Sequence, residues 1–180
     1  MTRTIPERVR WAVATLDVDP ADRILELGSG PGAAISLVCE RLDGGTITAI
    51  DRSPVQVARA LERNREHVAA GKASVRIEEL ERLSVGGDRF DKIFAIDVNH
   101  FWVHPAHREL DTLRCLLKPG GRLYLFYGGT TGATKTRPLA ERLAAALSER
   151  GFDATSVLRT DQPTPVLCVL GRNPDAAPIV

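Results

Sequence analysis

Short apolar runs alternate with amphipathic segments along this chain. The runs have the length of buried β-strands, and they lie at 23–27, 46–50, 74–77, 92–97, 122–127, 155–159 and 165–170. Segments with apolar residues three or four positions apart predict helices, and they occupy 6–16, 32–42, 53–70, 105–117 and 138–150. Strand–helix–strand alternation is typical of βαβ units, so the pattern predicts an α/β fold with a mostly parallel sheet of seven strands.

The last two strand candidates break this alternation. Residues 160–164 alone separate them, which is too short for the crossover that joins parallel strands. We therefore predict an antiparallel hairpin at one edge of a doubly wound sheet, with the last strand antiparallel. Residues 128–136 contain three glycines among threonines and predict a flexible loop after the fifth strand.

Composition and charge are those of an ordinary globular domain of 180 residues. The 24 basic and 23 acidic side chains give a net charge of +1, so no general attraction to nucleic acid or an anionic membrane is expected. Three scattered cysteines indicate neither a disulfide framework nor a metal site. With no secretory signal and no apolar run of about 20 residues, we expect a cytoplasmic protein with reduced thiols.

The sharpest chemical signal is a glycine loop between the first predicted strand and the following helix. Residues 26–33 read Glu-Leu-Gly-Ser-Gly-Pro-Gly-Ala. Glycine lets the backbone turn tightly and lets a ligand approach without interference from a Cβ atom. Because the loop also fits the G-x-G-x-x-G/A pattern of dinucleotide-binding folds, it leaves the ligand open when taken alone.

Two carboxylates beside the loop narrow the choice of ligand. Glu26 lies at the end of an otherwise apolar strand, where it would repel a pyrophosphate and stabilise a cationic head group. Asp51 ends the second predicted strand, where its oxygens can accept hydrogen bonds from ribose hydroxyls. These residues favour a ligand that combines a ribose with a positive charge.

Four sequence blocks make the chain resemble the class I S-adenosylmethionine-dependent methyltransferases. The blocks read Glu-Leu-Gly-Ser-Gly-Pro-Gly at 26–32, Ile-Asp-Arg-Ser-Pro at 50–54, Phe-Asp-Lys-Ile-Phe at 90–94 and Leu-Leu-Lys-Pro-Gly-Gly-Arg-Leu at 116–123. Their order and spacing are those of the family. The resemblance implies a Rossmann-like fold, the cofactor S-adenosyl-L-methionine, and one domain over 1–180 whose cofactor-binding half is about 1–100 and substrate-side half about 101–180.

The resemblance also implies a set of cofactor-binding residues. They are Glu26, Gly28, Ser29, Gly30, Pro31, Gly32, Asp51, Arg52, Glu79, Leu80 and Asp97. Glu26 and Asp97 would face the amino-acid end of the cofactor, Asp51 its ribose hydroxyls, and Arg52 its adenine. Glu79 would contact the adenine amine and Leu80 would offer its N–H to the ring, although the acidic run 78–81 allows a shift by one residue and the family more often has Asp there.

Residues after the fourth predicted strand are expected to face the methyl acceptor, because ligands of parallel sheets sit beyond the carboxyl ends of the strands. The expected substrate-side residues are Asn99, His100, Trp102 and Tyr127. Core packing explains Trp102 and Tyr127 equally well. His100 is the candidate general base, since an imidazole titrates near neutral pH.

The sequence therefore predicts a methyltransferase that transfers a methyl group in line to a small-molecule acceptor. Residues 97–100 read Asp-Val-Asn-His, which departs from the Asn-Pro-Pro-Tyr or Asp-Pro-Pro-Tyr segment that accompanies methylation of amide or exocyclic nitrogens in the family. Two alternatives stay open. One is a non-catalytic methyltransferase-like binding or partner subunit, and the other, less favoured, is an NAD(P)-dependent oxidoreductase. The oligomeric state is open, and a homodimer is compatible with the sequence.

Overall fold

The computed structural model describes residues 4–83, 87, 89–103, 106–128, 133–159 and 165–174, and of residues 102 and 133–135 the backbone only. Within these residues one seven-stranded sheet has the order β3-β2-β1-β4-β5-β7-β6. The strands are β1 (Arg23–Leu27), β2 (Thr46–Asp51), β3 (Ala73–Ile77), β4 (Phe90–Ile96), β5 (Leu117–Gly128), β6 (Asp153–Arg159) and β7 (Val166–Arg172).

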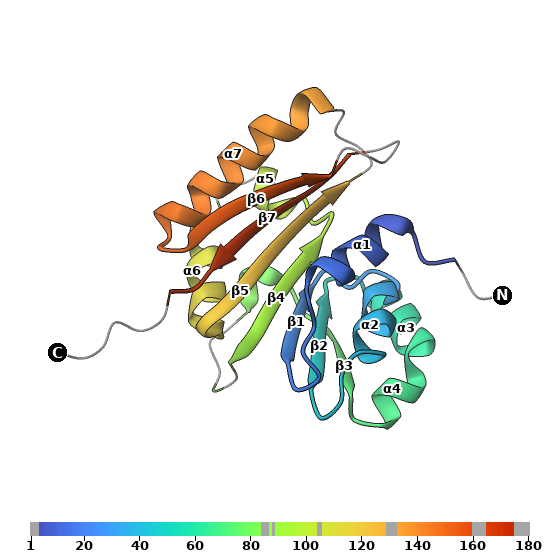
Figure 1. Ribbon diagram of the computed structural model, residues 1–180. Helices are drawn as coiled ribbons and strands as arrows, with labels where there is room; N and C mark the ends of the chain where they lie inside the picture. Colours follow the sequence, from blue (N-terminus) through green and yellow to red (C-terminus); the bar gives the residue numbers. More distant parts are fainter. Residues whose placement is uncertain are drawn as a thin grey trace.

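Helices connect the strands and cover both faces of the sheet (Figure 1). They are α1 (Glu7–Thr15), α2 (Ala33–Cys39), α3 (Pro54–Arg63), α4 (Arg65–Ala69), the short 3-10 helix η1 (Leu80–Arg82), α5 (His100–Val103), α6 (His107–Leu116) and α7 (Ala133–Glu149). Among the described residues, no helix has both the length and the apolar character needed to cross a membrane.

The strand directions confirm the doubly wound, mostly parallel sheet predicted from the sequence. Strands β1 to β5 pair in parallel, whereas β7 is antiparallel to both of its neighbours, β5 and β6. The chain runs outward from β1 to β3 and then returns to β4 on the other side of β1. This reversal creates a crevice at the carboxyl ends of β1 and β4, which is where ligands bind in such sheets.

Two apolar layers hold the helices against the sheet. One face of the sheet packs on α1, α2 and α3 through residues such as Val13, Ile35 and Phe94. The other face packs on α5, α6 and α7 through residues such as Leu113 and Leu143. Successive strand residues point to opposite faces, so each central strand contributes to both layers.

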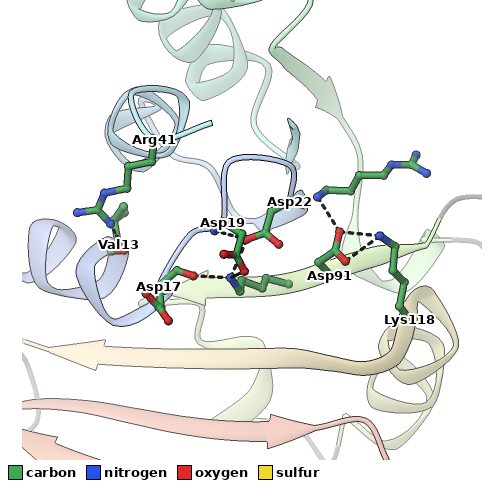
Figure 2. A network of polar contacts seen from close by, with 9 residues as sticks. Val13, Asp17, Asp19, Asp22, Arg41, Asp91 and Lys118 are labelled. Carbon is green, nitrogen blue, oxygen red and sulfur yellow. Dashed lines mark hydrogen bonds and ion pairs between the residues drawn. The ribbon is translucent and has the colours of Figure 1, made fainter. Parts of the chain in front are cut away.

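A polar network fixes the opposite end of the sheet, where the strands begin (Figure 2). Lys92 and Asp22 form a buried ion pair of 2.6 Å, and the ammonium of Lys92 also donates to the backbone carbonyl of Asp17. Beside it, Lys118 donates to both oxygens of Asp91, at 2.7 and 2.8 Å. These contacts tie the loop before β1 to β4 and β5, far along the strands from the crevice.

The helices differ most from the predicted ones in three places, apart from shifts of one to three residues at other ends. The helix predicted over 53–70 is divided at Asn64, whose backbone leaves the helical region at φ −110° and ψ 19°. The last helix begins at Ala133 and contains Pro138 as an internal residue. The loop predicted over 128–136 is therefore wrong at Gly128, which ends β5, and from 133 onward; residues 129–132 lie outside the described residues. The single turn α5 was not predicted, because four residues carry no readable period.

Candidate functional site

Two adjoining pockets occupy the crevice at the carboxyl ends of β1, β2 and β4. The β2 pocket, of about 510 Å³, is lined by residues from β2, η1 and the segment 96–103. The α1 pocket, of about 370 Å³, lies under the first turns of α1 and over the glycine loop. Both pockets are lined by Gly28, Gly30, Ile96 and Asp97. The two pockets thus form one elongated site that bends around the loop.

Most of the residues predicted from the sequence line this site. The β2 pocket includes Gly28, Gly30, Asp51, Arg52, Glu79, Leu80, Asp97, Asn99 and His100. The α1 pocket includes Glu26, Gly28, Ser29, Gly30, Pro31 and Asp97. Gly32 and Tyr127 line neither pocket, and the side chain of Trp102 lies outside the described residues.

The backbone donors of the glycine loop are already used within the protein. The N–H groups of Gly28 and Ser29 donate to the carbonyl of Ile50, at 2.8 and 2.9 Å. The N–H of Gly30 donates to Oδ2 of Asp51 at 2.8 Å, and that of the last glycine donates back to Ser29 at 3.0 Å. The residue between them is proline, which has no N–H. The loop therefore offers an anion no cluster of free backbone donors.

The three positions of the loop require glycine for different physical reasons. All three have positive φ, at 74°, 50° and 77°, a region that glycine enters without steric cost. A Cβ on Gly28 would lie 2.7 Å from the Val98 side chain, and one on Gly32 would lie 2.9 Å from the backbone of Ala60. A Cβ on Gly30 would meet nothing within 4 Å. Gly30 therefore faces the open site, while the other two permit close packing beneath it.

Glu26 is a buried carboxyl group at the floor of the α1 pocket. In the sheet it lies between Ala49 and Phe94, both members of the apolar layer under α1 and α2. The residue is 3% exposed, and its Oε2 has no hydrogen-bond partner among the described residues. Burial, and to a smaller extent the negative charge of Asp51, raise the pKa of Glu26 well above its usual value. Such a carboxylate is complementary to a ligand cation.

Asp51 is held with one bond to each carboxylate oxygen. Oδ2 accepts from the N–H of Gly30 at 2.8 Å, and Oδ1 accepts from the N–H of Ser53 at 2.9 Å. Each carboxylate oxygen can accept two hydrogen bonds, so both keep capacity for a ligand hydroxyl. The two backbone bonds fix the carboxylate at the end of β2 before any ligand arrives.

An acidic edge closes the far side of the β2 pocket. All four residues of the run 78–81 line it. Glu79 is half-exposed and pairs with Arg82 at 3.1 Å, whereas Glu81 reaches His100. The sequence prediction that Glu79 and Leu80 serve the ligand is compatible with this arrangement, and it stays a prediction because Glu78 lines the same pocket.

Asp97 joins β4, β5 and α1 at the boundary between the two pockets. Its φ is 56°, a conformation that Asp tolerates better than most residues. Oδ1 accepts from the N–H of Gly128 and Oδ2 from Nε of Arg8, both at 2.9 Å. Arg8 was not singled out from the sequence, because it lies 89 residues away from its partner and no spacing rule links the two.

His100 begins α5 and lies between two carboxylates at the rim of the β2 pocket. Its Nδ1 is 3.1 Å from Oε1 of Glu81, and its Nε2 is 3.6 Å from Oε1 of Glu109. The imidazole is 17% exposed. These contacts orient the ring between η1 and α6, and the ring lines the same pocket as Asp51.

Tyr127 and Asn99 differ in how they relate to the site. Asn99 is exposed and lines the β2 pocket. Tyr127 is buried, and its hydroxyl donates to the carbonyl of Val98 at 3.0 Å. Burial, followed by the charge of Asp97, raises the pKa of Tyr127. The hydrogen bond from Tyr127 to Val98 holds the loop after β4 in place. The predicted contact between Tyr127 and the substrate stays a prediction.

Asn64 is a second residue that sequence reasoning missed. Its amide nitrogen donates to the carbonyls of Gly32 and Ala60, at 3.0 and 2.9 Å, and its Oδ1 accepts from the hydroxyl of Ser36 at 2.7 Å. The side chain thereby joins the glycine loop, α2 and the end of α3. A buried amide between two predicted helices was the available signal, but it was read as part of one continuous helix.

Comparison with known proteins gives a consistent family match. A family model described as a methyltransferase domain matches residues 25–123, which is more than half of the chain. Among curated relatives, the release factor glutamine methyltransferase of Salmonella typhimurium is 34% identical over 69% of this chain and 52% of its own length. The chain spans about half, or less, of the length of the curated relatives it matches.

Solved structures agree with the fold. The magnesium protoporphyrin IX methyltransferase ChlM from Synechocystis PCC 6803, solved with bound SAM, has a TM-score of 0.66 and 19% identity, covering 91% of this chain and 75% of its own. The [4+2]-cyclase SpnF has a TM-score of 0.75 and 19% identity, covering 94% of this chain and 82% of its own. At such low sequence identities the likeness shows a shared fold only. The activity has to be argued from the residues of the site.

Proposed function

The chain belongs to the methyltransferase domain family, and from this membership we propose that it is an S-adenosylmethionine-dependent methyltransferase acting on a small-molecule acceptor. One observation carries the choice of cofactor. The buried Glu26 has an unpaired oxygen under the glycine loop, and the backbone donors at 28, 29, 30 and 32 are consumed inside the protein. A cationic ligand head fits this site, whereas a pyrophosphate would find a negative charge and few donors.

The residues around the two pockets suit the parts of this cofactor. Glu26 binds the ammonium of the methionine portion, and Asp51 accepts hydrogen bonds from the ribose hydroxyls. Gly30 leaves room above the loop for the methionine portion of the cofactor. Support comes from the unpaired oxygen of Glu26, from the open space at Gly30, and from the spare acceptor capacity of Asp51. The adenine lies against Arg52 and the acidic run 78–81, which line the β2 pocket.

The cofactor supplies a methyl group already activated by a positively charged sulfur, so the protein's work is alignment and proton handling. His100 accepts the proton of an acceptor hydroxyl or amine at the rim of the β2 pocket. Glu81 and Glu109 hold the imidazole on either side, and Asn99 lies beside it as a hydrogen-bonding group for the acceptor.

A small acceptor with an apolar part is favoured by the surroundings of His100. Val103 lines the β2 pocket and also a separate pocket of about 380 Å³, whose walls include the apolar residues Phe101, Leu110 and Leu143. The name of the Salmonella relative describes a protein acceptor. That acceptor is not carried over, because this chain spans only half of the relative and has Asp-Val-Asn-His at 97–100.

Calorimetric titration with S-adenosylhomocysteine, with NAD as a parallel ligand, tests the cofactor. We expect micromolar binding of the first ligand and none of NAD. Binding of NAD alone would favour the oxidoreductase alternative, and binding of neither would reject the proposed function. Donor binding without turnover across a broad acceptor panel would favour the non-catalytic alternative.

Turnover of an acceptor found in that panel then tests His100. We expect His100→Ala to lower kcat by about 100-fold or more, the usual range for a lost general base, with little change in binding of S-adenosylhomocysteine. His67→Ala, in α4 away from the site, is the matched control and keeps full turnover. Equal turnover of both variants would show that His100 is not the base.

A further inference from the structure

The α1 pocket carries opposite charges on two of its walls. The carboxyl group of Glu26 lies at its floor, and the guanidinium of Arg8 reaches it from α1. A pocket with a buried acceptor on one side and a charged donor on the other is complementary to a zwitterion, such as the α-amino-acid head of a ligand. Glu26 is the partner of the ligand's ammonium. The ligand's carboxylate still needs hydrogen-bond donors.

The backbone N–H groups of the glycine loop are not free to bind the ligand's carboxylate. Within residues 28–32 each N–H already donates to the carbonyls of Ile50 and Ser29 or to Asp51. A carboxylate left without donors in a partly closed pocket costs free energy. Charged side chains are the stronger donors for a carboxylate, and the cationic residues that line this pocket are Arg8 and Arg63.

Arg8 is the better placed of the two because it is held in position. Its Nε donates to Oδ2 of Asp97 at 2.9 Å, and Oδ1 of the same carboxylate is fixed by the N–H of Gly128. A Cβ at Gly128 would lie 3.5 Å from Cδ of Arg8, so the stem of the arginine passes over that glycine. Among the described residues, the guanidinium of Arg8 forms its ion pair with Asp97 through Nε. The N–H groups on its two Nη atoms can therefore donate to a ligand.

We propose that Arg8 binds the carboxylate of the donor's methionine portion, with Asp97 as the residue that positions it. This inference rests on the proposed function, since it assigns one more residue to the same donor site. Glu26 then binds the ammonium of the amino-acid head, and Arg8 binds its carboxylate. Helix α1 becomes part of the donor site, because its first turns carry the guanidinium that completes the pocket.

A comparison of two ligands and two proteins tests this assignment. The ligands are S-adenosylhomocysteine and its decarboxylated analogue, 5′-(3-aminopropylthio)-5′-deoxyadenosine, which keeps the ammonium and lacks the carboxylate. We expect the wild-type protein to bind the first about tenfold more tightly than the second, as for one charge-assisted contact. In Arg8→Gln that preference should fall to about twofold or less, with the loss confined to S-adenosylhomocysteine.

Two further variants separate Arg8 from general charge effects. Arg10→Gln removes the same charge from an exposed position of α1 outside the pocket lining and should keep the wild-type preference. Loss of the preference in Arg63→Gln but not in Arg8→Gln would overturn the assignment, as would a wild-type protein that binds the two ligands equally. A wild-type protein that binds neither ligand would reject the proposed function and this inference together.

Discussion

The carboxyl group of Glu26 lies in an apolar layer, and its pKa is raised above the usual value by burial and by Asp51. A raised pKa in the folded state means that the folded protein holds the proton more tightly than the unfolded chain does. The stabilising contribution of this group is therefore fully present below about pH 4.5 and is lost as the pH rises through the raised pKa. Above the raised pKa, the ionised form weakens the fold.

We expect Glu26→Gln to raise the melting temperature at pH 7.5 by about 2–5 °C, because it removes the buried charge. The difference from the wild type should shrink as the pH is lowered toward 4.5. Differential scanning calorimetry across this pH range measures it. A variant that is less stable than the wild type at every pH would contradict the account of Glu26 as a strained, ligand-directed group.

The same substitution should weaken binding of the donor. A ligand ammonium needs the ionised carboxylate, so the affinity of the wild type for S-adenosylhomocysteine should fall as the pH drops through the raised pKa of Glu26. Glu26→Gln should bind about tenfold more weakly at pH 7.5, as when a charge-assisted bond becomes a neutral one, and its affinity should lack that pH dependence. Titration calorimetry at several pH values gives both results.

Sequence reasoning reached Glu26 and Asp51 because both stand at strand ends next to a glycine loop, where the strand pattern alone fixes their place. It did not reach Arg8. The contact between Arg8 and Asp97 depends on how α1 crosses the sheet, which is set by packing of the apolar layer and leaves no local pattern in either segment.

At the scale of elements, Asn64 holds the glycine loop against α2 and α3. Asn64→Ala removes three hydrogen bonds and leaves the carbonyl of Gly32 and the hydroxyl of Ser36 with fewer partners. We expect a loss of about 2–4 kcal/mol in the free energy of unfolding, whereas Ser36→Ala, which removes one of these bonds, costs about 1 kcal/mol. Urea denaturation of the two variants gives the comparison. Equal losses would show that the amide does not bridge the elements.

The ion pair of Lys92 and Asp22 is a second contact between elements, at the end of the sheet away from the site. Their side chains are 6% and 7% exposed. Lys92→Met leaves Asp22 buried without its cation and should cost about 3–5 kcal/mol. Adding Asp22→Asn should recover part of that loss. Urea denaturation measures the stabilities, and affinity for S-adenosylhomocysteine should stay within about twofold in both proteins.

Strands were easier to predict than helix boundaries, for physical reasons. The central strands are buried on both faces, so they appear as unbroken apolar runs. The break at Asn64 depends instead on a tertiary bridge to Gly32. Pro138 suggested a helix start, because proline suits a first turn, but α7 continues through it from Ala133. Local propensity was overruled in both cases by packing.

For the whole molecule, the strand order places the strand-end parts of the proposed site together at the carboxyl ends of the parallel strands. The reversal between β1 and β4 brings the glycine loop, Asp51 and Asp97 to a common crevice. This much follows from βαβ connectivity and could be predicted. The closing of the crevice by α1 could not be predicted, because the helix precedes the first strand and its direction across the sheet is not fixed by connectivity.

Because α1 forms one wall of the α1 pocket, ligand binding should reach its backbone. We expect saturating S-adenosylhomocysteine to slow hydrogen exchange of α1 and of the segment 97–103 by about tenfold or more, since opening of these segments must first release the ligand. Exchange in β6 and β7, outside both pockets, should be unchanged. In Arg8→Gln the protection of α1 should decrease while that of 97–103 persists. Protection confined to 97–103 in the wild type would mean that α1 covers the crevice without contributing to the donor site.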